Sequence, residues 1–223
     1  MAEPSLPEVL PVFPLTGALL LPGNYLPLNV FEPRYRNLVA DALAGERTIG
    51  MIQPRQPDPA DQWGLWEEPP NPELYGVGCA GGIERSEPQA DGRYLIVLKG
   101  VARFRVRDEL PLHRGYRRVR ADYGEFAADR DGPREALDPA PVLASVRAFS
   151  RAHGLELDFT LLSGLSGITL LNGLAAALPF GPAEKQALLE AAGPAERKEL
   201  LLSLLQMGVP RGAREHWVPP TVH

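Results

Sequence analysis

Residues 94–107 read YLIVLKGVARFRVR and contain the clearest strand signal in the chain. The first five of these residues are apolar, and further along Ala102, Phe104 and Val106 alternate with arginines. Strict alternation of apolar and polar residues is typical of a strand with one buried face. We therefore expect a β-sheet whose strands continue on both sides of this stretch.

The sequence before this stretch predicts short strands and one helix. Strands are expected at 9–15, 26–31, 48–52 and 74–84. Prolines within 9–15 restrict that segment to an edge or bulged strand, and Asp91-Gly92 predicts the hairpin turn before residue 94. Pro33 opens a helix that Gly45 ends. Many short strands with one early helix indicate a closed or nearly closed β barrel.

After Gly124 the sequence becomes helical. Helices are expected at 141–153, at 158–178 with an internal break, at 183–192 and at 195–207. Glycine or proline separates each of these segments from the next. The predicted fold class is therefore α+β, with a β barrel over 1–124, a helical bundle over 133–208 and a tail over 209–223.

The composition is that of an ordinary globular protein, with 44% hydrophobic and 23% charged residues in a chain of 223. The single cysteine, Cys79, allows no intramolecular disulfide. No apolar run is long enough to cross a membrane, and the N-terminus lacks the features of a signal peptide. We expect a cytoplasmic protein that makes no contact with a membrane.

Motifs for catalysis are missing from the sequence. None of the lysines follows a glycine-rich phosphate loop, which excludes a Walker A motif. The four histidines are scattered without ligand spacing, so no metal site is predicted. Ser163 and Ser166 lie between glycines and are interpreted as helix-capping residues rather than nucleophiles. We predict no catalytic residue, no metal and no cofactor.

The net charge of −5 conceals one basic segment. Residues 99–123 carry eight Lys or Arg against three acids, whereas residues 1–98 carry six against thirteen. Five arginines of the basic segment form a candidate basic face: Arg103, Arg105, Arg107, Arg118 and Arg120. We favour a solvated face that is balanced by acids from the N-terminal region. The alternative is a surface that binds RNA or an acidic partner.

Three segments carry a family resemblance: PVFPL at 11–15, LPG at 21–23 and LPLNVFEPRY at 26–35. They resemble the start of the N-terminal (LON) domain of the ATP-dependent Lon proteases, and the resemblance covers about 8–206. It implies a PUA-like β barrel followed by a helical bundle. It also implies recognition of unfolded or degron-bearing polypeptides. Neither the Walker A ATPase motif nor the Ser-Lys protease dyad is present, so we expect a stand-alone, non-catalytic member.

Two places are candidates for binding protein segments. The first joins a strand to a helix and comprises Phe31, Glu32, Arg34 and Tyr35. There we favour a structural role, in which Glu32 caps the helix or pairs with an arginine, over contact with a ligand. The second is the proline-rich loop 53–72 with Trp63 and Trp66. Those rings could clamp hydrophobic segments, although we favour packing onto the barrel.

The expected partners are therefore unfolded or degron-bearing polypeptide segments. A groove, or the boundary between barrel and helices, would hold them, with main-chain pairing along an edge strand. A protease or chaperone acting in trans is a further partner that the resemblance allows. RNA binding remains the second hypothesis.

Overall fold

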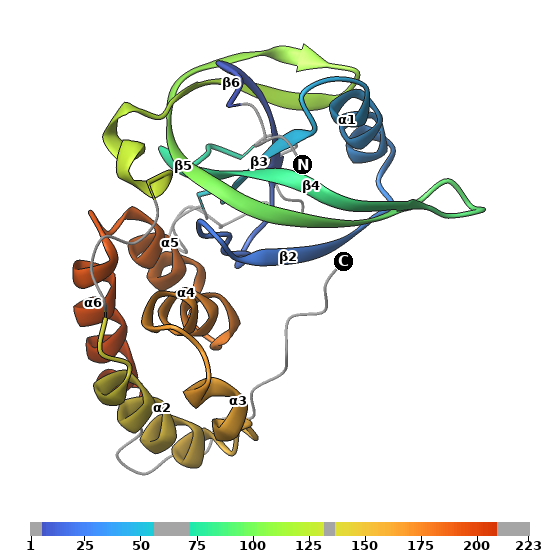
Figure 1. Ribbon diagram of the computed structural model, residues 1–223. Coiled ribbons are helices and arrows are strands. Elements are labelled where there is room, and N and C mark those ends of the chain that lie inside the picture. Colours follow the sequence, from blue (N-terminus) through green and yellow to red (C-terminus); the bar gives the residue numbers. More distant parts are fainter. Residues whose placement is uncertain (1–5, 56–71, 132–136, 209–223) are drawn as a thin grey trace, which may run out of the picture.

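The computed structural model describes residues 6–55, 72–131 and 137–208. Strands fill its first half and helices its second half, which confirms the α+β class (Figure 1). The strands are β1 (Val9–Pro14), β2 (Tyr25–Val30), β3 (Thr48–Ile52), β4 (Val77–Pro88), β5 (Tyr94–His113) and β6 (Tyr116–Asp122). The helices are α1 (Pro33–Ala44), the 3-10 helix η2 (Gly124–Asp129), α2 (Ala140–His153), α3 (Phe159–Ser163), α4 (Gly167–Ala177), α5 (Pro182–Glu190) and α6 (Pro194–Met207).

The strands form one sheet that closes into a barrel. Their order is β2-β5-β4-β3-β1-β6, and an additional pairing of β6 with β5 closes the last five strands into a ring, with β2 attached outside it. The long strand β5 makes this possible because its first half pairs with β2 and β4 and its second half with β6. Phe104 of β5 is fully buried inside the barrel with Leu10 and Val119. A Cβ atom on Gly78 would lie 2.5 Å from Cζ of Phe104, so the ring fits only against a glycine.

The prediction that residues 9–15 form an edge or bulged strand is wrong, because strand β1 is neither. It pairs with β6 over Val9–Val12 and with β3 over Val12–Pro14. Pro11 therefore lies in the half that pairs only with β6, and Pro14 in the half that pairs only with β3. At each proline, β1 has a paired strand on one side only. The hydrogen bond that proline cannot donate is not needed on the other side, which explains how two prolines fit an inner strand.

Beyond the barrel, three strand segments extend as a flap that we call the wing. It consists of β2, residues 83–88 of β4 and residues 94–99 of β5, and the β4–β5 hairpin at its end projects away from the helices α2–α6 (Figure 1). The predicted Asp91-Gly92 turn closes the β4–β5 hairpin, with Gly92 at a φ of 82°. The Asp91 carboxylate accepts a hydrogen bond from the Arg93 N–H at 3.1 Å.

The predicted boundaries of helix α1 are confirmed: Pro33 lies in its first turn and Gly45 is its C-cap. Its buried residues are Tyr35, Leu38, Val39 and Ala42. The Tyr35 ring stacks on that of Phe13 of β1 at a centroid distance of 4.1 Å. This face therefore fixes the helix to the barrel.

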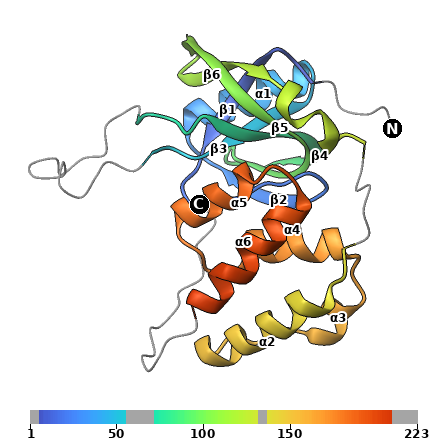
Figure 2. The ribbon, with the colours of Figure 1, turned by 90° about the vertical axis from the view of Figure 1, so that its left-hand side faces the viewer.

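The C-terminal helices also match the prediction, including the break within 158–178. Asp158 caps α3 by accepting from the Thr160 N–H at 2.9 Å, and Ser166 caps α4 by accepting from the Thr169 N–H at 3.3 Å. Gly154 ends α2 in the left-handed conformation. Helices α4–α6 lie next to the barrel, whereas α2 and α3 lie at the far end (Figure 2).

The boundaries proposed between the two parts, at residues 124 and 133, stay a prediction. The last strand ends at Asp122 and α2 begins at Ala140. The predicted tail 209–223 lies outside the described residues. No helix in the described part of the chain is both long and apolar enough to cross a bilayer.

Candidate functional site

The corner between β2 and α1 holds three of the predicted binding residues at the surface. The Phe31 side chain is 46% exposed. Glu32 pairs with Arg34, whose Nε donates to Glu32 Oε2 at 2.9 Å. The Glu32 side chain makes no capping hydrogen bond, although its residue occupies the N-cap position. Of the two structural roles expected for Glu32, pairing is confirmed and capping is wrong.

The fourth predicted residue of this corner, Tyr35, lies in the core. Its burial raises the pKa of the phenol above its ordinary value, and its ring is held between Phe13 and the Arg34 guanidinium, 4.6 Å from its centroid. Tyr35 therefore does not share the exposed surface of Phe31, Glu32 and Arg34. Trp63 and Trp66 lie outside the described residues, so their role stays a prediction.

The outer face of the wing carries a hollow of about 330 Å³. Its lining residues come from all three strands: Pro27, Leu28, Asn29, Arg85, Glu87, Leu95, Ile96 and Val97. Leu95 is 42% exposed, and Tyr25, at the other end of β2, is 58% exposed. Apolar side chains gathered at a hollow are typical of a surface that binds a partner.

Strand β2 borders this hollow and has a free edge. Among the residues that the structure describes, it pairs with β5 only, from Tyr25 opposite Lys99 to Val30 opposite Tyr94. A free edge presents unpaired N–H and C=O groups to another chain. Asn29 Oδ1 is buried beside it and has no hydrogen-bond partner in the described chain. A buried acceptor without a donor is costly, which favours an occupant that supplies one.

Four of the five arginines in the predicted basic face have partners at the surface. Arg105 Nε donates to Glu125 Oε2 at 2.6 Å, and Arg107 donates to Asp122. Arg120 donates to Glu8 at 3.0 Å, and Arg118 donates to the Pro111 carbonyl at 3.3 Å. The prediction that acids of the N-terminal region balance this face is correct only for Glu8. The other acids belong to β6 and η2, the elements next to these arginines in sequence.

These pairs also change the acidity of the carboxyl groups. The hydrogen bond from Arg105 lowers the pKa of Glu125. The Gly124 N–H, followed by the Arg107 side chain, lowers the pKa of Asp122. Both acids are therefore charged at neutral pH and offset the arginines, which weakens the case for RNA binding.

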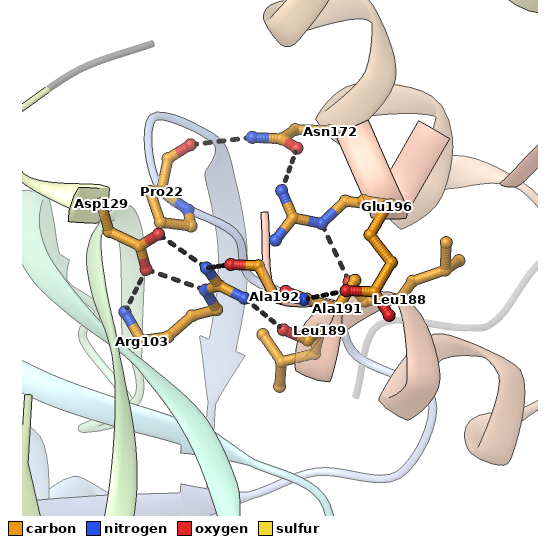
Figure 3. Close-up of polar contacts among 10 residues, drawn as sticks. Pro22, Arg103, Asp129, Asn172, Leu188, Leu189, Ala191, Ala192 and Glu196 are labelled. Atoms are coloured by element: carbon orange, nitrogen blue, oxygen red, sulfur yellow. Dashed lines mark hydrogen bonds and ion pairs between the residues drawn. The ribbon is translucent and has the colours of Figure 1, made fainter. Parts of the chain in front are cut away.

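Arg103, the fifth arginine, is 2% exposed, so the expectation of one surface with five guanidinium groups is wrong. Helix η2 covers it, and its Nε and Nη2 atoms each donate to the Asp129 carboxylate at 2.8 Å. Its Nη1 donates to the Leu189 carbonyl at 3.0 Å and also to that of Ala191 (Figure 3). Arg103 therefore joins the barrel to the turn between α5 and α6.

Arg103 belongs to a buried polar cluster between barrel and helices that we call the junction. Its side chains are those of Arg103, Asp129, Asn172, Lys185, Gln186 and Arg197. Lys185 Nζ donates to the Gly17 carbonyl at 2.9 Å. Figure 3 shows that Asn172 Nδ2 donates to the Pro22 carbonyl, at 3.2 Å. Of these residues, the sequence predicts a site role only for Arg103, because no local signal indicates that a polar helix residue is buried.

Burial governs the acidity of the junction cations. It lowers the pKa of Lys185, and it lowers that of Arg197 to about 10. Arg197 Nη1 donates to Asn172 Oδ1 at 3.0 Å, whereas its Nη2 has no partner in the described chain. The charged groups of the junction are therefore bound mainly by carbonyl oxygens. We interpret the junction as a structural feature rather than a binding site.

Nothing in the described residues suggests a metal centre. No group of three or more His, Cys, Asp or Glu side chains lies close enough together there to hold an ion. Cys79 is buried, and burial raises the pKa of its thiol, which keeps it protonated. The wing remains the candidate site, and it has the character of a binding surface.

Known structures share this arrangement of a barrel and a helical bundle. The "Lon N-terminal domain protein from Xanthomonas campestris" is similar with a TM-score of 0.60 and 26% identity, over 87% of this chain and 97% of that one. The N-terminal domain of a Mycobacterium avium complex Lon protease gives a TM-score of 0.59 over 89% of this chain and 98% of that one. At 17% identity, the second similarity shows the fold alone.

The sequence comparisons agree with the fold. The model of the "ATP-dependent protease La (LON) substrate-binding domain" matches residues 9–207, and the chain belongs to that family. It is 28% identical to Lon protease 2 of Myxococcus xanthus over 92% of its own length, and 34% identical to Lon protease 2 of Sorangium cellulosum over 58%. It spans 25% and 15% of those two proteins.

Proposed function

We propose that this chain is a non-catalytic module that binds extended segments of unfolded or degron-bearing polypeptides at the wing. One observation carries the proposal: within the described residues, β2 pairs on one side only and lies beside an apolar hollow. Membership of a substrate-binding family supports it. We further propose that the protein acts in the cytoplasm, with a protease or chaperone in trans as a second partner.

The geometry suggests how such a segment would lie. It would add a strand beside β2, with main-chain hydrogen bonds that any sequence can make. Every second side chain would then face the outer side of the wing, where Leu95 and Val97 line the hollow. Asn29 would turn its side chain to meet a donor of the added strand. The combination gives affinity with little demand on sequence.

We also propose that the barrel, 1–124, and the bundle, 133–208, act as one body, with 209–223 as a tail. The junction supports this view because its hydrogen bonds cross from one part to the other. Gln186 Nε2, for example, donates to the Val77 carbonyl at 3.1 Å. The wing would then be presented on a stable base.

Fluorescence anisotropy with a labelled, permanently unfolded polypeptide tests the proposal. We expect saturable binding that survives moderate salt and is not displaced by RNA. Leu95→Ser should weaken it about tenfold, because it removes roughly 1.5 kcal/mol of apolar contact. Leu112→Ser is the matched control, since Leu112 lies on the same strand and is 52% exposed outside the wing.

Two results would contradict the proposal. Equal weakening by both substitutions would show that the wing has no special part in binding. Displacement by RNA, with a steep dependence on salt, would favour the basic segment instead.

A further inference from the structure

A second hollow, of about 360 Å³, lies between α1 and the β4–β5 hairpin. Its lining residues are Pro33, Arg36, Asn37, Ala40, Pro88, Gly92 and Tyr94. Because side chains alternate along a strand, Tyr94 faces the side of the wing opposite to Leu95. The two hollows therefore lie on opposite faces of the wing.

Arg36 in this hollow differs from the arginines around it. Every other arginine of the described chain between Arg34 and Arg120 has a carboxylate or carbonyl partner. Arg36 has no such partner among the described residues, although it is partly buried. A guanidinium group held in a hollow without an acceptor is available to an anion from outside.

The polar groups next to Arg36 are already occupied. Asp91 at the hairpin tip accepts from Arg93 Nε at 2.6 Å, so its carboxylate is turned to its own hairpin. Asn37 is bound to Arg114, donating to its carbonyl at 2.9 Å and accepting from its Nη2 at 3.1 Å. Gly92 lies directly beneath Arg36, since a Cβ atom there would be 2.2 Å from Nη2. The turn favours glycine because of its positive φ of 82°.

The remaining walls are suited to the hydrocarbon part of an amino-acid residue. Pro33 and Pro88 are apolar, and Tyr94 adds an aromatic ring. The volume is at the small end of ligand pockets, which span roughly 300–1,000 Å³. The hollow also lies at the Val30 end of β2, because Val30 pairs with Tyr94. A segment that follows β2 would reach it.

We propose that Arg36 binds a carboxylate of the polypeptide that lies along the wing, an inference that rests on the proposed function. The guanidinium would donate two parallel hydrogen bonds to the two carboxylate oxygens. The carboxylate could be the C-terminus of the segment or an acidic side chain, and the experiments below separate these sources.

Titration with a small carboxylate tests the subsite without any peptide. The probe is N-acetyl-leucine, followed through the Arg36 Nε–Hε signal in an NMR spectrum and assigned by its loss in Arg36→Gln. The acid should shift this signal in a saturable manner, and N-acetyl-leucinamide should not. Equal shifts with both compounds, or none with either, would overturn the subsite.

Peptide affinity then distinguishes the sources of the carboxylate. Arg36→Gln should weaken binding about fivefold, as expected for one partly exposed ion pair. Arg93→Gln is the matched control, because it removes the same charge from a paired arginine on the hairpin that borders the hollow, whereas Arg36 lies on α1 and is unpaired among the described residues. An effect that disappears with C-terminally amidated peptides assigns the C-terminus. One that persists there, but requires Asp or Glu in the peptide, assigns the side chain.

The two proposals fail in different ways. If Leu95→Ser weakens polypeptide binding and Arg36→Gln does not, binding at the wing is supported and the carboxylate subsite is wrong. If the protein binds no polypeptide at all, the proposed function fails, and the titration with N-acetyl-leucine decides the subsite by itself.

Discussion

The wing and the junction share strand β5, yet they use polar and apolar groups in opposite ways. In the wing, Leu95 and Tyr25 are exposed, and the charged pair of Arg85 and Glu87 lies at the surface. In the junction, Arg103 and Lys185 are buried and bound to main-chain carbonyls. In the described chain the junction satisfies its polar groups internally except for Arg197 Nη2, whereas the wing has a free edge and an open hollow, and the unpaired Arg36 of α1 lies beside its hairpin. This contrast separates the part that holds the protein together from the part that is open to a partner.

Substitution of Arg103 should give the largest effect on stability. Arg103→Met leaves Asp129 without its partner in a nearly buried position, and we expect a loss of about 3–5 kcal/mol in the free energy of unfolding. Arg105→Met is the control, since it lies on the same strand and pairs with an acid of the same helix at the surface. It should cost less than about 1 kcal/mol. Urea unfolding measures both, and equal losses would remove the distinction between buried and exposed pairs.

Lys185 provides a pH test of the junction. Burial lowers its folded pKa, so just below the ordinary lysine value of about 10.4 the unfolded state binds more protons than the folded state. The free energy of unfolding of the unsubstituted protein should therefore rise with pH relative to Lys185→Met. Urea unfolding near neutral pH and at about pH 9.5 measures this difference. Parallel pH curves would show that folding does not lower the pKa of Lys185.

Glu32→Ala should have the smallest effect. The Glu32–Arg34 pair is partly exposed and no capping bond is lost, so we expect a decrease of less than about 0.5 kcal/mol. Asp158→Ala removes a genuine N-cap and should cost about 1 kcal/mol. Thermal melts compare the two. A larger loss at Glu32 would show that this residue has a structural role beyond its pair with Arg34.

The sequence predicted the elements well because their signals are local. The helix expected at 141–153 is found at Ala140–His153, where Gly154 ends it. The strand at 48–52 and the Asp91-Gly92 turn are also correct. Proline, glycine and hydrophobic periodicity act over a few residues, so they can be read without knowledge of the fold.

The candidate site was less predictable because it depends on distant contacts. Alternation places Arg103 and Arg105 on one face of the strand, but only Arg103 is covered by η2, which begins more than 20 residues later. The hollow of the wing forms only when β2 lies beside β5, and nothing in the sequence of residues 25–30 indicates that β5 is the neighbouring strand. Pro27 was the one available signal, because proline within a strand favours an edge position.

The pairing of β1 with β6 has a consequence for how the protein is made. Val9, the first residue of β1, pairs with Arg120 in the last strand of the barrel. A ribosome produces the chain from its N-terminus, so the half of β1 that pairs with β6 must wait until almost the whole barrel has been synthesised. Contacts between residues so far apart in sequence also form slowly. During that interval the nascent protein exposes apolar strands, and it resembles the unfolded segments that we propose as its ligands.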